Sequence, residues 1–475
     1  MKKWVCVLYT FVFMGLCAAP LLGLIFGYEN VNAEKRALAS PPDIIKNGQV
    51  NFDFTKQFDD YFTDNFAFRT NLVTLNAFLN AGVFGESVSE QVIIGKDGWL
   101  FFEPTLRDYK KQNTLSDNEI YRLARTLKIQ CDALLLNGTQ FIFAVAPNKA
   151  SVYGRYMPDR YKVTGDMSNA EKLFAAFDEC GFVYADLFTP LRESSMRVYH
   201  KQDTHWNNTG ALIARRKLLE TARKHNDFGF RQYDIDAFTE TEWEGDLAAM
   251  LYPAARVRDT QQDYGVKKEY ETLRPMRSLE DLTIMAESAT GELNALMFRD
   301  SFANALIPIL SNDFAAVTYS RAVPYDYSLL KEDTDIVILQ IAERNLPDLL
   351  LAAPLLSAPR AYIDVFGARA LDCRIDIKFT EDSIRIAGIA APPGHEPYKN
   401  YDVYVRISGG DTNMVFTPFP ILEKDAFEGE EHFANAAFSM LLDKSILYEN
   451  EYAVEVMLFD GARWFVSNAQ SLRRV

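Results

Sequence analysis

Hydrophobic and polar positions follow two different patterns in this chain, and the change falls near residues 351–354. Before this point, apolar runs typical of buried strands alternate with segments in which apolar residues recur at helical spacing. From about residue 362 onward, apolar and polar residues alternate strictly, as they do in half-buried strands. The sequence therefore predicts an α/β domain followed by a smaller all-β, sandwich-like domain.

The first pattern begins with a helix and a buried strand. Ser116 and Glu119 form a capping-box signature, after which apolar residues recur at helical spacing to Leu134. The apolar run 141–146, closed by Pro147, is typical of a parallel strand that is covered on both faces. Such βα alternation predicts a three-layer α/β domain with a mostly parallel sheet. Further strands are expected at 182–185, 293–298, 314–319 and 336–342, and further helices near 173–177, 211–222 and 303–310.

The N-terminal end carries a different signal, an uncharged run from Trp4 to Tyr28 that follows Lys2 and Lys3. As a helix, about 25 residues reach about 37 Å, enough for the hydrocarbon core of a bilayer. The lysines favour a cytoplasmic N-terminus, which places the rest of the chain outside the cytoplasmic membrane. A cleaved signal peptide is the alternative. It is less favoured because its apolar segment is normally only about 7–15 residues long.

These patterns divide the chain into four predicted segments. Residues 1–30 form the membrane anchor or signal peptide, and residues 31–90 form a stalk with an aromatic amphipathic helical segment. Residues 91–355 form the α/β domain, which opens with a hairpin turning at Asp97-Gly98. Residues 360–475 form the β domain, a fold that would suit a carbohydrate-binding module.

Composition excludes several classes of protein. The net charge of −15 argues against a chain that binds nucleic acid through bulk electrostatics. Only five cysteines occur, two of them within the apolar N-terminal run, so disulfides do not organise the fold. Their spacing contains no CxxC pair and gives no sign of a zinc site, and no cofactor motif is present.

Histidine is scarce, and the segment 199–207 holds two of the five, His200 and His205. In an extended segment, Asp203 and His205 point to the same side, where a carboxylate can orient an imidazole. One alternative is a structural turn followed by a helix cap at Asn208 or Thr209. Another is a metal site formed by His200, Asp203 and His205, although no second carboxylate or cysteine cluster accompanies it.

A serine occupies the second chemically notable position. The apolar strand 293–298 stops at Arg299-Asp300 and leads through Ser301 into an expected helix. A serine there lies at the carboxyl end of a parallel strand, where open α/β sheets bind ligands. Asp300 or Ser301 could instead simply cap the helix. Because a serine nucleophile needs a base, and the base an orienting acid, the pairing with Asp203 and His205 favours catalysis.

At these residues the chain resembles the alginate O-acetyltransferase group of SGNH-hydrolase-like proteins, the AlgJ and AlgX type, also called DHHW proteins. The resemblance rests on Asp203-Thr204-His205-Trp206, the strand–Asp300-Ser301-Phe302 element, and the segments 94–101 and 146–153. It implies Ser301 as nucleophile, His205 as general base and Asp203 as its orienting acid. It also implies a partner, a membrane-bound O-acyltransferase that delivers acetyl groups across the bilayer.

The sequence departs from the family's pattern at Arg299, which replaces the glycine of a Gly-Asp-Ser block. Arg299 is therefore a candidate substrate-binding residue beside the oxyanion hole. Asn148, which follows the strand 141–146, and Arg344, which follows the strand 336–342, are further substrate-binding candidates. Asn148 and Arg344 could equally have a structural role.

Taken together, the sequence predicts a single-pass membrane protein that acts outside the cytoplasm as a polysaccharide O-acetyltransferase. An acetyl-polysaccharide esterase would use the same three residues and pass the acetyl group to water. A non-catalytic polysaccharide-binding assembly protein is a third alternative. The net negative charge makes a neutral or weakly charged glycan the easier substrate, since a strongly anionic polymer would need a local basic groove.

Overall fold

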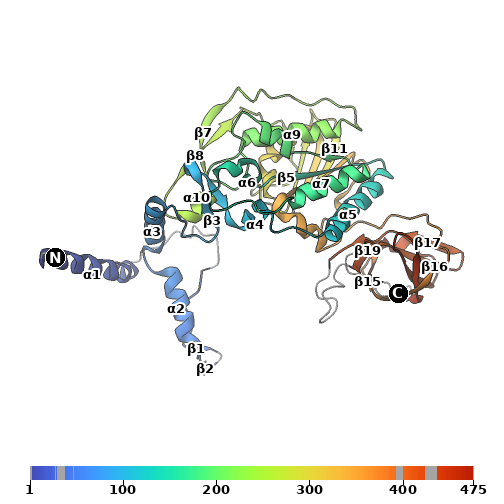
Figure 1. The fold of residues 1–475 in the computed structure, drawn as a ribbon, viewed down its shortest axis with the longest axis horizontal. Helices are drawn as coiled ribbons and strands as arrows, with labels where there is room; N and C mark the ends of the chain where they lie inside the picture. Colours follow the sequence, from blue (N-terminus) through green and yellow to red (C-terminus); the bar gives the residue numbers. More distant parts are fainter. Residues whose placement is uncertain are drawn as a thin grey trace.

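The computed structural model describes residues 3–26, 28, 38–46, 48–391, 400–422 and 436–473. Their main features are a group of N-terminal helices, a central region built on a seven-stranded sheet, and a C-terminal region built on a nine-stranded sheet (Figure 1). The seven-stranded sheet lies within the predicted segment 91–355, and the nine-stranded sheet lies within the predicted segment 360–475.

The seven-stranded sheet is mixed. Its strand order is β6-β5-β13-β11-β12-β10-β9. The five strands from β6 to β12 run parallel, whereas β10 pairs antiparallel with both β12 and β9. The bounds are β5 Gln140–Ala146, β6 Tyr184–Ala185, β9 Tyr270–Thr272, β10 Thr283–Ser288, β11 Leu293–Phe298, β12 Phe314–Ser320 and β13 Ile336–Ala342.

Both faces of this sheet are buried at the central strands β5 and β13, which explains the uninterrupted apolar run of β5. Ile142 and Ala144 belong to one hydrophobic cluster, together with side chains of α9 (Asn208–Ala222). Phe141 and Phe143 belong to a second cluster with side chains of α5 (Asp117–Leu135) and α7 (Asn169–Cys180). The core is therefore divided by the sheet, with helices on either side.

Several predicted elements are confirmed. The strands expected at 293–298 and 336–342 coincide with β11 and β13. The capping box at Ser116 is present, with both of its hydrogen bonds. β3 (Val92–Ile94) and β4 (Leu100–Phe102) form the expected hairpin, whose turn has positive φ at Asp97 and Gly98.

Other elements were not expected from the sequence. These are the edge strands β9 and β10 and the hairpin of β7 (Thr239–Glu244) with β8 (Arg258–Asp263). Every residue of β7 is exposed, so its sequence has no reason to show an apolar alternation. The missed hairpin matters because the chain between its strands contributes to the candidate site.

The α-helix predicted over 303–310 is wrong in form. Ser301–Ala305 is a 3₁₀ helix, η4, followed by the short α-helix α11 (Ile307–Leu310). Pro308 has no N–H to donate to the carbonyl oxygen of Asn304, and its ring crowds that carbonyl, which disfavours a continuous α-helix through this segment. Ser301 therefore opens a tight 3₁₀ turn instead of a long helix.

The nine-stranded sheet encloses one buried cluster. The start of β14 (Arg369–Phe379) pairs with β21, and the remainder pairs with β15, so this strand connects the two halves of the sheet. The C-terminal β-rich region expected from the alternating pattern is thus present. The other strands are β15 Ser383–Ala391, β16 Asp402–Gly409, β17 Thr412–Phe416, β18 Phe419–Pro420, β19 Ala437–Asp443, β20 Glu451–Phe459, β21 Trp464–Ser467 and β22 Gln470–Arg473.

The N-terminal region consists mainly of three helices, α1 (Lys3–Ile25), α2 (Phe54–Asn65) and α3 (Arg69–Phe84). Among the described residues, α1 alone is long and apolar enough to cross a membrane, although a signal sequence at this position would meet the same criterion. A small hairpin of β1 (Ile45–Lys46) and β2 (Gln49–Val50) precedes α2.

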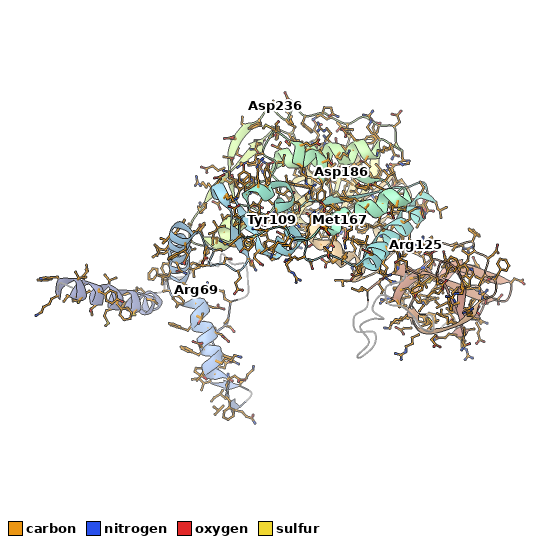
Figure 2. The ribbon with its side chains drawn as sticks, viewed as in Figure 1. Arg69, Tyr109, Arg125, Met167, Asp186 and Asp236 are labelled. Atoms are coloured by element: carbon orange, nitrogen blue, oxygen red, sulfur yellow. The ribbon has the colours of Figure 1, made fainter. Side chains whose placement is uncertain are left out.

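Helix α5 connects the central region to the nine-stranded sheet. The guanidinium of Arg122, which is 5% exposed, donates to the carbonyl oxygens of Ile421 and Ala437. Arg125, one turn farther along α5, faces the C-terminal region and lies 3.4 Å from the carboxylate of Asp402 (Figure 2). The contact therefore combines a buried polar anchor with a half-exposed ion pair.

We expect Arg122→Met to lower the free energy of the first unfolding transition by about 2–5 kcal/mol, because two buried carbonyl groups lose their donor. The matched change Arg125→Met, at the half-exposed pair with Asp402, should cost less than about 1 kcal/mol. Urea unfolding followed by far-ultraviolet circular dichroism measures both. Equal effects of the two substitutions would contradict the assigned role of Arg122.

Candidate active site

The loop 199–206 and the turn after β11 bring together the three residues that the sequence singled out. The loop closes through an antiparallel bridge between Tyr199 and Trp206. His205 Nδ1 lies 2.8 Å from Asp203 Oδ1, and His205 Nε2 lies 2.9 Å from Ser301 Oγ. A continuous hydrogen-bonded chain thus runs from carboxylate to imidazole to hydroxyl, although 96 residues separate His205 from Ser301.

Asp203 is buried and surrounded by donors. Its carboxylate accepts hydrogen bonds from the backbone N–H of His205 at 2.9 Å, from Trp243 Nε1 at 3.0 Å and from the backbone N–H of Asp246 at 3.2 Å. Burial alone would raise the pKa of Asp203, but the hydrogen bonds and charge of His205, with the bond from Trp243, hold it well below its usual range. The carboxylate is therefore ionised and suited to hold an imidazole Nδ1–H.

A second carboxylate, Asp246, lies against the same imidazole. Its Oδ2 is 3.7 Å from His205 Nδ1, and its Oδ1 accepts from the backbone N–H of Thr204 at 2.7 Å. Burial, followed by the negative charge of Asp203, raises the pKa of Asp246. Helix α10 (Asp246–Leu251) can approach this closely because Gly245 precedes it: a Cβ at Gly245 would lie 2.1 Å from the carbonyl oxygen of Gln202.

Lys149 holds the loop 199–206 through hydrogen bonds to its backbone. It is 4% exposed, and its Nζ donates to the carbonyl oxygens of His200 at 3.2 Å, Lys201 at 3.0 Å and Asp203 at 2.6 Å. Three acceptors match the three N–H groups of an ammonium. Burial nevertheless lowers the pKa of Lys149 to about 7. The helix α6 (Lys149–Tyr153) thereby determines the shape of the loop that carries Asp203 and His205.

The turn that presents Ser301 is held by its neighbour Asp300. One carboxylate oxygen of Asp300 accepts from the backbone N–H of Phe302 at 2.9 Å and from Gln340 Nε2 at 3.1 Å. The other oxygen accepts from the backbone N–H of Ala342 at 2.5 Å. Asp300 therefore caps the 3₁₀ turn and also ties it to the end of β13. The ring of Phe302 packs edge-on against His205, with 5.0 Å between ring centroids.

Asn148 and Arg344 lie at the same edge of the sheet as Ser301. They follow β5 and β13, and Ser301 follows β11, which are three adjacent parallel strands. The Oδ1 atom of Asn148 and the Nη1 atom of Arg344 are buried without a hydrogen-bond partner. The guanidinium of Arg344 lies over the ring of Phe302, 5.4 Å from its centroid. Both side chains thus hold an unpaired polar atom at the sheet edge that also carries the Ser301 turn.

Arg299 is placed differently. It is 3% exposed, and its guanidinium donates to the carbonyl oxygens of Leu279 and Asp281 and to Asn304 Oδ1. These bonds join the Ser301 turn to the loop that precedes β10. The contacts of Arg299 are those of a structural residue: among the described residues, its guanidinium hydrogen-bonds backbone carbonyls and Asn304.

Glu343 lies behind Asn148. Its carboxylate accepts from the backbone N–H of Asn148 at 2.8 Å and from Ser151 Oγ at 2.6 Å. Burial raises the pKa of Glu343 to about 7, and the nearby Asp108 contributes in the same direction. Asp108 in turn accepts from Asn148 Nδ2 at 3.3 Å. Two carboxyl groups therefore hold Asn148 in place.

The alternative metal site of His200, Asp203 and His205 is not the cluster that the structure assembles. His200 stacks on Trp243, with 4.8 Å between ring centroids, and burial lowers the pKa of His200 to about 4. The potential ligands that lie within 4.8 Å of one another, among the described residues, belong to Asp203, His205 and Asp246. An ion bound there through Nδ1 of His205 would displace the hydrogen bond from that nitrogen to Asp203.

Sequence reasoning missed Trp243, Asp246 and the role of Lys149. The first two lie about 40 residues beyond Asp203 and show no local pattern that would connect them to it. Lys149 stands in the segment 146–153 that the resemblance already included. The sequence feature that could have indicated its role is the position of Lys149 just after a buried strand, where a lysine is rarely found unless it is paired.

Comparison with known proteins adds a family. Residues 92–287 match the family model of the SGNH hydrolase-like domain of the acetyltransferase AlgX. Within these residues the chain is similar to that SGNH hydrolase-like domain. The matched stretch includes Asp203, His205 and Asp246 and ends before Ser301. The place of Ser301 in the site therefore rests on the geometry described above.

The chain is also similar in sequence to named bacterial proteins. The chain is 25% identical over 249 residues to a Pseudomonas syringae pv. tomato protein named "Probable alginate O-acetylase AlgJ", covering 52% of this chain and 60% of that protein. It is 26% identical over 206 residues to the Pseudomonas aeruginosa protein of the same name, covering 42% of this chain and 51% of the other. The alignments thus span only about half to three-fifths of these relatives.

A solved structure, PatB1 of Bacillus cereus, superposes on this chain with a TM-score of 0.41 and 16% sequence identity. The superposition covers 54% of this chain and 97% of PatB1.

The buried carboxyl group of Glu343 should make stability depend on pH. Its folded pKa of about 7 exceeds the ordinary value of 4.5, so its contribution is fully present below pH 4.5 and is lost as pH rises to 7. Relative to Glu343→Gln, the wild type should lose about 3 kcal/mol across this window. Urea unfolding at a series of pH values measures the difference. The exposed change Glu332→Gln is the control, and parallel curves for wild type and Glu343→Gln would refute the assignment.

Proposed function

We propose that this chain is a polysaccharide O-acetyltransferase in which Ser301 is the nucleophile, His205 the general base and Asp203 the orienting acid. The observation that carries the proposal is the chain of two hydrogen bonds, 2.8 Å and 2.9 Å long, that joins these residues. The match to an acetyltransferase domain and the names of the relatives support the acetyl group as the group transferred.

In the first half-reaction, Ser301 Oγ attacks the carbonyl carbon of an acetyl donor while His205 Nε2 takes its proton. The imidazolium, stabilised by ionised Asp203, then gives the proton to the leaving group, and acetyl-serine remains. In the second half-reaction, the neutral imidazole takes the proton of a sugar hydroxyl as its oxygen attacks the acetyl-serine. The bond between the acetyl carbon and Ser301 Oγ then breaks, and the imidazolium returns the proton to Oγ, which leaves an acetylated sugar, free Ser301 and neutral His205.

Substrate contacts are assigned to Asn148 and Arg344, which follow strands β5 and β13 at the sheet edge. Asn148 and Arg344 each hold a buried polar atom without a partner, and the bound substrate would supply one. We assign Arg299 an indirect role, because its guanidinium is already bonded to the backbone that holds the Ser301 turn.

The remaining parts follow from the same proposal. Residues 91–355 would form the three-layer SGNH-like catalytic domain, and residues 360–475 a carbohydrate-binding module. Helix α1 would anchor the chain with the catalytic domain outside the cytoplasm. There, a membrane-bound O-acyltransferase would supply the acetyl groups, and the acceptor would be an exopolysaccharide or cell-wall glycan.

An acetyl-polysaccharide esterase is the second candidate, because the side chain of His205 is 27% exposed and water can reach it. The deciding experiment incubates the protein with a chromogenic acetyl ester, with and without neutral and anionic oligosaccharides, and analyses the sugars by mass spectrometry. Acetylated oligosaccharide supports the transferase. Free acetate alone, together with deacetylation of an acetylated glycan, supports the esterase.

Ser301→Ala should reduce acetyl-ester turnover by several orders of magnitude, because only binding and electrostatic stabilisation would remain. Its circular dichroism spectrum should match that of the wild type. Ser328→Ala, at an exposed position of the same domain, is the control and should retain full turnover. Near-native turnover by purified Ser301→Ala would exclude this serine as the nucleophile.

The two carboxylates beside His205 should differ in importance. Asp203→Asn should lower kcat by about 10³–10⁴-fold, since it removes the acceptor that holds the imidazole. Asp246→Asn, whose oxygen is 3.7 Å from Nδ1, should lower kcat by less than about 10-fold.

A double-mutant cycle checks this assignment. On a His205→Ala background, adding Asp203→Asn should have little further effect, because residues acting as one unit are not additive. Fully additive losses would count against the triad. Activity that is lost to a chelator and restored by a divalent ion would instead favour the metal cluster of Asp203, His205 and Asp246.

A further inference from the structure

Helix α3 has an unusual surface for a helix outside the core. No charged residue occurs from Thr70 to Gly85. Its exposed side carries Leu75, Leu79 and Val83, which are 54%, 56% and 70% exposed. The positions recur every four residues and therefore form one continuous apolar stripe. A helix that faces water normally presents charged or polar residues on that side.

The opposite side of α3 is firmly packed. Ala77 is fully buried in a cluster with Leu247 and Leu251 of α10. Thr74 is also buried, and its hydroxyl oxygen accepts from the backbone N–H of Ala254 at 2.8 Å. The helix is thus an integral part of the central region, and the apolar stripe is left over after its own packing is complete.

The position of α3 relates it to the N-terminal helix. A Cβ built on Gly23 of α1 would lie 2.3 Å from Ala67, just before α3. The ring centroids of Tyr28 and Phe68 lie 4.2 Å apart, and the Tyr28 hydroxyl donates a hydrogen bond to Asn71 Oδ1 at 3.1 Å. In Figure 1, α3 stands beside the end of α1 and crosses its direction. Arg69, at the start of α3, marks this junction in Figure 2.

We infer that the exposed stripe of α3 lies in the interfacial layer of the lipid bilayer that α1 spans. The inference rests on the proposed membrane anchor. If α1 crosses the bilayer, its contacts hold the start of α3 where the chain leaves the membrane. A helix that crosses the direction of α1 there lies along the membrane surface. Lipid is therefore next to the stripe, and an uncharged stripe is suited to the boundary between headgroups and acyl chains.

This placement also locates the candidate active site. Helix α10, which packs against α3, begins at Asp246, the carboxylate 3.7 Å from His205. The membrane-facing helix is thus separated from the Ser301 site by a single helix. An acetyl donor that emerges from a membrane-embedded protein would meet the nucleophile close to the membrane surface.

The test uses the full chain in phosphatidylcholine vesicles that contain nitroxide-labelled lipid. Single cysteines carrying a fluorophore are placed at Leu79 and Val83, with Phe13 in α1 as the positive control and Glu220 on α9 as the negative control. The fluorophores at Leu79→Cys and Val83→Cys should be quenched at least two-fold more than the one at Glu220→Cys. Thermal unfolding verifies that each variant is folded. The five native cysteines are first replaced by alanine: Cys6, Cys17, Cys131, Cys180 and Cys373.

The controls separate the possible failures. Quenching at Phe13 without quenching at Leu79 and Val83 overturns the inference while leaving the anchor intact. No quenching at Phe13 overturns the anchor, and the inference with it. Labels at Leu79 and Val83 that are shielded only after a membrane protein is added would mean that a protein, not lipid, covers the stripe. Acetyl-ester turnover of the native chain reports separately on the proposed function.

Discussion

The geometry of the candidate site depends on one buried ammonium group. Three carbonyl oxygens of the loop 200–203, those of His200, Lys201 and Asp203, point toward Lys149. The Nζ of Lys149 donates a hydrogen bond to each of them. A buried carbonyl without a donor costs about 1–3 kcal/mol, so the loop could not keep this shape around an apolar side chain. The shape of the loop in turn places Asp203 and His205 side by side. The arrangement of Asp203 and His205 is thus maintained by a lysine from a separate element, helix α6.

Negative charge around the ammonium is distributed unequally. Asp203 accepts several donors and keeps its pKa low, whereas burial and that neighbouring charge raise the pKa of Asp246. Asp259 accepts hydrogen bonds from the backbone N–H groups of Lys201 and Gln202 and so also stabilises the loop. Environments that separate the pKa values of neighbouring carboxyl groups are a usual way to give them different roles. Here one carboxylate holds the imidazole, and the others hold the loop.

Features that depend on adjacent residues could be predicted from the sequence. The hairpin at Asp97-Gly98, the strand 293–298 and the shared side of Asp203 and His205 all follow from local periodicity. The contribution of Asp246 could not be predicted, because a hairpin without apolar alternation brings it back to the loop. The interruption of the helix after Ser301 could have been predicted, because Pro308 disfavours the long α-helix that the apolar spacing indicated. The hydrogen bonds from the Arg299 guanidinium to the backbone carbonyls of Leu279 and Asp281 could not be predicted, because no sequence pattern indicates where the loop before β10 lies.

Two interactions of Asp300 fix the Ser301 turn. Its carboxylate accepts from the backbone N–H of Phe302, which caps the 3₁₀ turn, and from the backbone N–H of Ala342 at the end of β13. That second bond connects the serine turn to the strand that lies between β11 and β5. Because strands are spaced about 4.8 Å apart, residues after β11 and β5 are only roughly 10 Å apart across the sheet edge. The strand order therefore places Ser301, Arg344 and Asn148 at one edge of the sheet, after three adjacent strands.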